Sequence, residues 1–75
     1  MDIKEKFGCK IKELREKKGY SIEYLANISN IDRTYISDIE KGKRNVSITI
    51  MEKILTGLDT DFMIFFNDKN FKNAK

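Results

Sequence analysis

A chain of 75 residues forms one domain and buries only about 60% of its unfolded surface, which excludes a large internal catalytic cavity. Histidine is absent and cysteine occurs once, at Cys9, so the commonest general base is missing and the soft ligands of a zinc site are too few. The formal net charge of +3 is compatible with a polyanionic partner but does not by itself indicate one.

The same composition predicts where the protein acts. The first residues, Met-Asp-Ile-Lys-Glu-Lys, lack the apolar stretch of a signal peptide, and no run approaches the ~18 apolar residues of a membrane span. A lone cysteine is typical of a reducing compartment, and we interpret Cys9 as a small, partly buried hydrophobic residue. We therefore expect a cytoplasmic protein that is not an enzyme and that has no membrane segment, metal, cofactor or small-molecule ligand.

Residues 3–18 are predicted to form the first helix. Ile3, Phe7, Ile11 and Leu14 recur at steps of four, four and three, which places them on one helical face. Gly19 follows several basic residues and suits a left-handed C-cap, where the helix dipole also favours positive charge.

A second, short helix is predicted to begin after Ser21, which is a good N-cap. Its apolar residues, among them Leu25 and Ala26, cover little more than two turns. Asn30 then interrupts the pattern, and asparagine tolerates the left-handed backbone that a tight turn between helices requires.

The third helix is predicted over about 33–41, with Asp32 as its N-cap and a glycine closing it. Ile36 and Ile39 are three residues apart and face inward, and the small side chain of Ala26 allows the second helix to cross closely. The pattern at about 21–41 therefore predicts a helix-turn-helix unit.

Two further helices complete an all-α fold. After the N-cap Ser47, a stripe at i, i+3, i+4 and i+7 indicates the fourth helix, and Asp-Thr-Asp precedes a short fifth helix at 62–66. We predict a single compact five-helix domain over 1–75, with an ordered core at about 3–66 and a loosely ordered polar tail at 67–75.

The third helix carries the residues that are best suited to reading DNA. If its isoleucines point inward, the helical step of 100° places Arg33, Thr34 and Ser37 on or near the opposite face. Arginine donates two parallel hydrogen bonds to guanine, and threonine and serine offer hydroxyl groups to base edges. We therefore predict that these three residues contact the bases of the major groove.

Contacts to the DNA backbone are predicted for the end of this helix and the loop that follows. The loop carries three cations without an intervening acid and lies where the DNA backbone passes a docked recognition helix. Asp38 repels phosphate, so we interpret it as a local cap partner or an acceptor for cytosine and leave it out of the site. The predicted backbone-contacting residues are Tyr35, Lys41, Lys43, Arg44 and Asn45.

The five consecutive apolar residues at 62–66 exceed what one face of a short helix can bury within the chain. A homodimer would cover the remainder, and the sequence leaves open which of these residues are core and which cross the interface. The predicted interface residues are Ile50, Phe62, Ile64, Phe65 and Phe66.

Two stretches, GCKIKELREKKGYSIEYLA at 8–26 and ISDIEKGKR at 36–44, resemble the lambda-repressor-like (Xre/Cro-type) family. Within it, NIDRTYISDIEKGKRN at 30–45 and FMIFF at 62–66 are similar to the controller proteins of restriction-modification systems. The resemblance implies a dimeric autoregulator on paired operator half-sites, and an ion pair between Arg15 and Glu40. This sequence departs from the family at one position, because Ile22 stands where many members carry a DNA-contacting glutamine.

Other functions of the same fold stay open at this point. A phage-type or developmental repressor, or an antitoxin, shares every predicted fold feature with a controller protein. A protein-interaction module would use the helix-turn-helix surface for a protein partner. The sequence does not decide the operator bases, whether binding activates or represses transcription, which genes are controlled, or whether RNA polymerase is a further partner.

Overall fold

The computed structural model describes residues 1–72, and its regular elements are all helical. The predicted all-α class with five α-helices is confirmed, and the described residues contain no strand. The helices are α1 (Ile3–Lys17), α2 (Ile22–Ser29), α3 (Arg33–Glu40), α4 (Ile48–Gly57) and α5 (Phe62–Phe66), followed by the 3-10 helix η1 (Lys69–Phe71).

Short polar side chains fix where the helices begin. Ser21, Asp32, Ser47 and Asp61 each accept a hydrogen bond from the backbone N–H three residues further along, at 2.9–3.3 Å. These bonds satisfy amide groups that have no partner within the helix. The four helix starts that the sequence predicts are therefore confirmed by their caps.

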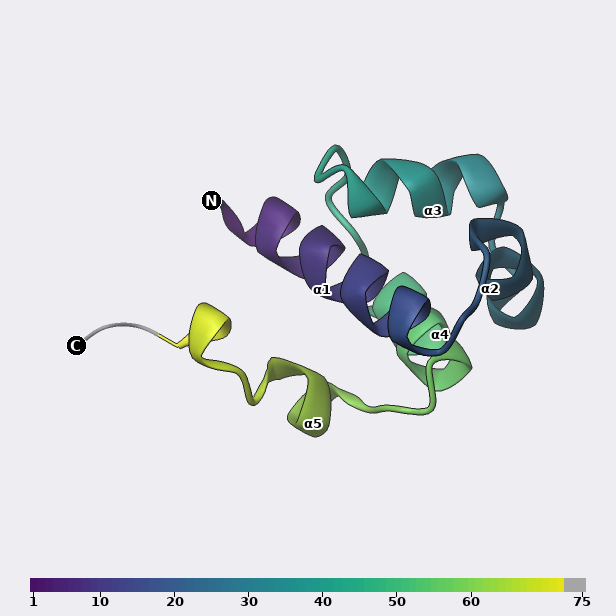
Figure 1. Ribbon diagram of the computed structural model, residues 1–75. Helices are drawn as coiled ribbons and strands as arrows, with labels where there is room; N and C mark the ends of the chain where they lie inside the picture. The colour runs from purple at the N-terminus through teal and green to yellow at the C-terminus, as the bar shows by residue number, and fades with distance from the viewer. Residues whose placement is uncertain (73–75) are drawn as a thin grey trace.

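The core lies where α1 to α5 converge. Helix α1 packs on α3, α2 packs on both α3 and α4, and α4 packs on α5. In Figure 1, α3 runs along the upper edge of the molecule and α5 lies at the lower edge, with α1 and α4 between them. The site on α3 and the apolar helix α5 are thus on opposite sides. The buried apolar residues are Phe7, Ile11, Leu25, Ala26, Ile36, Ile39, Ile54, Leu55, Leu58 and Phe65.

Gly8 allows α1 to approach the end of α3 closely. A Cβ atom at this position would lie 2.1 Å from the carbonyl oxygen of Ile39, which is far below contact distance. The missing side chain therefore sets how near α3 lies to the core, a requirement that the amphipathic pattern of α1 does not reveal.

The interpretation of Cys9 as partly buried is wrong, because its side chain is exposed. Phe7 and Ile11 define the buried face of α1, and each is two residues away from Cys9. At 100° per residue, Cys9 projects about 160° from both of them, toward solvent. Ile3 is also largely exposed, although it follows the same helical spacing as the buried residues.

The polar tail contains more order than its composition predicts. In η1, Phe71 packs against Phe65 and Phe66, with ring centroids 5.7 and 4.8 Å apart. The ammonium group of Lys10 lies 2.6 Å from the carboxylate of Asp68, and this hydrogen bond lowers the pKa of that carboxyl group. One apolar residue and one ion pair thus hold the segment on the domain, while residues 73–75 of the predicted tail lie outside the described residues.

Within 1–72, every helix is too short or too polar to cross a membrane.

Candidate nucleic-acid interface

A tight turn joins α2 to α3. Asn30 adopts the predicted left-handed conformation with φ at 57°, and the N–H of Ile31 donates to the carbonyl of Ala26 at 3.0 Å. Ile36 and Ile39 are 0% and 1% exposed and anchor α3 to the core. The inward direction of these isoleucines is confirmed, which leaves the opposite face of α3 uncovered.

The uncovered face of α3 presents the three predicted base-contacting residues. Arg33 and Thr34 are exposed and Ser37 is half-buried. All three line an open hollow of about 510 Å³, and Ser21 and Ile22 at the start of α2 line it from the other side. The first turn of α2 therefore belongs to the same surface, although the sequence pattern places no DNA contact there. Backbone N–H groups at a helix start are suited to phosphate.

The loop after α3 carries the predicted backbone-contacting residues. Lys41, Lys43, Arg44 and Asn45 are exposed, and the chain turns at Gly42, whose φ is +74°. The remaining predicted contact, Tyr35, is half-buried on α3 with its ring under the guanidinium of Arg44. The structure thus places a cationic loop directly beside the uncovered face of α3.

Two acidic residues pair with cations of this surface. The guanidinium of Arg33 lies 3.4 Å from the carboxylate of Glu23, with both side chains largely exposed. Arg44 lies 3.2 Å from the carboxylate of Asp38. Sequence reasoning missed both pairs, because their members come from different elements whose relative placement depends on the turns between them.

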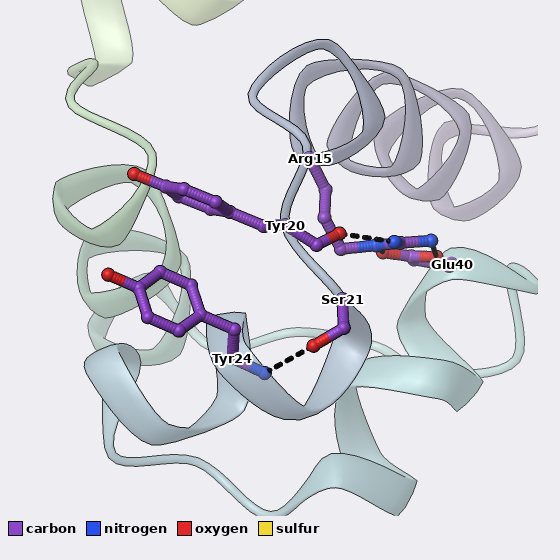
Figure 2. A network of polar contacts seen from close by, with 5 residues as sticks. All are labelled: Arg15, Tyr20, Ser21, Tyr24 and Glu40. Atoms are coloured by element: carbon purple, nitrogen blue, oxygen red, sulfur yellow. Dashed lines mark hydrogen bonds and ion pairs between the residues drawn. The ribbon is translucent and has the colours of Figure 1, made fainter.

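A buried ion pair fixes the two ends of the helix-turn-helix unit (Figure 2). The guanidinium of Arg15 donates two hydrogen bonds to the carboxylate of Glu40, at 2.7 and 3.0 Å, and a third to the carbonyl of Tyr20, at 2.8 Å. The hydrogen bond to Glu40 raises the pKa of Arg15. The ion pair implied by the family resemblance is confirmed, and it ties α1 to the end of α3 and to the segment that leads into the Ser21 cap.

The predicted interface residues divide into three groups. Phe65 is 1% exposed and belongs to the core of this chain, because its ring packs against Phe7 and Phe66. Phe62, Phe66 and Ile50 are half-buried. Ile64 is 65% exposed, and its neighbour Met63, which the prediction omitted, is also exposed. The apolar surface that stays uncovered on α5 therefore centres on Met63 and Ile64.

The fold and the site define a helix-turn-helix protein, and residues 11–65 match the family model described as helix-turn-helix. The chain is 50% identical to the control protein C.MunI of Mycoplasma sp over 89% of its own length and 92% of that protein. It is 47% identical to the control protein C.BamHI of Bacillus amyloliquefaciens, over 76% and 72% of the two chains. The chain belongs to the helix-turn-helix family and, within it, to the control proteins of restriction-modification systems.

Solved structures of similar proteins include one determined with DNA. The restriction-modification controller protein C.Esp1396I superimposes on this chain with a TM-score of 0.83 and 42% identity, over 88% of this chain and 87% of the other. That protein was crystallised as a tetramer in complex with its natural 35-base-pair operator.

Proposed function

We propose that this protein is a transcription regulator of a restriction-modification system, which binds operator DNA as a dimer and controls expression of that system. It acts with the DNA in the cytoplasm and has no catalytic role. The observation that carries the proposal is the uncovered face of α3, where Arg33, Thr34 and Ser37 border a hollow beside a cationic loop. The identities to control proteins support it.

Base readout is assigned to α3. An α-helix fits the major groove of B-DNA, and an arginine at its start reaches the O6 and N7 atoms of guanine with two parallel hydrogen bonds. Arg33 is the first residue of α3 and its side chain is exposed, so it is our first choice for this contact. Thr34 and Ser37 lie on the same surface and supply further hydroxyl contacts.

Phosphate binding is assigned to the loop after α3 and to the start of α2. Lys41, Lys43, Arg44 and Asn45 are exposed on one side of the groove-reading face, with Tyr35 beside them. The backbone amides that follow Ser21 approach from the other side. Contacts on both sides of α3 would fix its register on the duplex without selecting a sequence.

Dimerisation is assigned to α5 and the adjoining part of α4. Met63 and Ile64 are exposed apolar residues, and Phe62, Phe66 and Ile50 are half-buried in the single chain. Because α5 and α3 lie on opposite sides of the molecule (Figure 1), pairing through α5 leaves both copies of α3 free. A two-fold dimer would place the two recognition helices about 34 Å apart, in successive major grooves.

Gel-shift and footprinting experiments on the DNA upstream of the protein's own gene test this function. We expect protection of two half-sites whose centres are separated by about 10 base pairs or a multiple of that spacing. With six to ten phosphate contacts per dimer, affinity should fall by roughly 10³ to 10⁵ between 50 and 200 mM salt. Absence of any protected segment at micromolar protein would reject the proposal.

A further inference from the structure

A carboxylate lies on the surface that is assigned to DNA. Asp38 follows Thr34 by one helical turn and lines the same hollow as Arg33 and Ser37. Its side chain is 25% exposed. A negative charge at this place opposes the approach of phosphate, and it can act on binding directly or through the cation that it contacts.

Asp38 holds the guanidinium of Arg44. One carboxylate oxygen, Oδ2, accepts hydrogen bonds from Nε and Nη2 of Arg44, at 3.3 and 3.2 Å. The guanidinium carbon also lies 4.9 Å from the ring centroid of Tyr35, which is three residues before Asp38 and therefore on the same face of α3. A carboxylate and an aromatic ring thus hold the cation against the recognition helix.

The backbone strengthens this arrangement. The N–H of Lys43 donates to the carbonyl of Asp38 at 3.0 Å, so the loop is fastened to the same residue through its main chain. Arg44 is consequently placed next to α3, with its charge offset by Asp38. In contrast, Lys41 and Lys43 extend from the loop and are exposed.

We propose that Asp38 is a specificity-determining residue that acts through Arg44 and lowers the affinity for DNA outside the operator. This inference rests on the proposed function. Nonspecific binding depends almost entirely on net positive charge near phosphates, and the Asp38–Arg44 pair removes one cation from that interaction. On the operator, α3 lies in the groove and Arg44 is already ordered beside it. The smaller entropy cost of ordering Arg44 then offsets the repulsion between the Asp38 carboxylate and phosphate.

The test compares Asp38→Asn with the wild type on two duplexes of equal length, the footprinted operator segment and a scrambled sequence. At 100 mM salt, we expect affinity for scrambled DNA to rise about tenfold, which corresponds to about 1.4 kcal/mol. The salt dependence on scrambled DNA should steepen by about one unit per protomer. Operator affinity should change by less than about threefold, so the preference for the operator decreases.

Two controls separate the proposed role from a simple change in charge. Glu13→Gln removes the same charge from an exposed position on α1, and we expect little change on either duplex. In an Arg44→Gln background, Asp38→Asn should lose most of its effect on scrambled DNA. An equal gain with and without Arg44 would show direct repulsion and overturn the role assigned to the pair.

The outcomes also separate this inference from the proposed function. If the wild-type protein prefers the operator but Asp38→Asn has the same affinities as Glu13→Gln for both duplexes, the inference is overturned and the proposed function stands. A wild-type protein without preference for any upstream segment would overturn the proposed function, and the inference with it.

Discussion

Replacing Arg15 by methionine should lower the free energy of unfolding by about 3–5 kcal/mol. The change removes both hydrogen bonds to Glu40, whose side chain is only 5% exposed, and leaves an uncompensated buried carboxylate. It also removes the donor to the Tyr20 carbonyl. Urea unfolding followed by circular dichroism measures the effect.

Two variants control this prediction. Lys12→Met places the same side chain at an exposed position of the same helix and should change the free energy of unfolding by less than about 0.5 kcal/mol. The double variant Arg15→Met/Glu40→Met should recover most of the loss, because a buried ion pair is often replaced by apolar residues at little cost. If Arg15→Met alone lowers the free energy of unfolding by less than about 1 kcal/mol, the ion pair does not stabilise the helix-turn-helix unit.

Ile64→Glu should abolish the dimer and lower operator affinity by at least about 100-fold. A glutamate in the paired apolar surface would be buried without a partner, and a monomer loses the gain from binding two half-sites at once. Because Ile64 is 65% exposed in the single chain, the fold of the protomer should be retained. Analytical ultracentrifugation and operator titration measure the two effects.

The matched control is Ile28→Glu, which changes an exposed isoleucine on α2, a helix that lies apart from α5 in Figure 1. This variant should remain dimeric. If Ile64→Glu stays dimeric at micromolar concentration and binds the operator like the wild type, the interface lies on another surface.

The local signals in the sequence predicted the fold well. The caps Ser21, Asp32 and Ser47 and the left-handed Asn30 depend on a few consecutive residues, and each is found as expected. The burial of Ile36 follows from helical periodicity in the same way. The periodicity therefore also identified which face of α3 stays uncovered.

Features that depend on how separate helices and loops pack against one another were harder to predict from the sequence. The ring of Phe65 fills the core while the adjacent Ile64 faces outward, and an unbroken apolar run gives no signal to distinguish them. The pairing of Asp38 with Arg44 depends on the turn at Gly42, whose positive φ brings the loop back onto α3. Phe71 is a single apolar residue in a polar segment, and its packing became visible only with the core in place.

Base reading by the uncovered face of α3 can be measured with Arg33→Ala. Its affinity for the operator and for a scrambled duplex is compared with that of Lys43→Ala, a variant of an exposed loop cation. We expect Arg33→Ala to lose about 1–3 kcal/mol of binding free energy on the operator and little on scrambled DNA, while Lys43→Ala weakens binding to both duplexes by a similar factor. Equal losses on the two duplexes for Arg33→Ala would show that this face of α3 does not read bases.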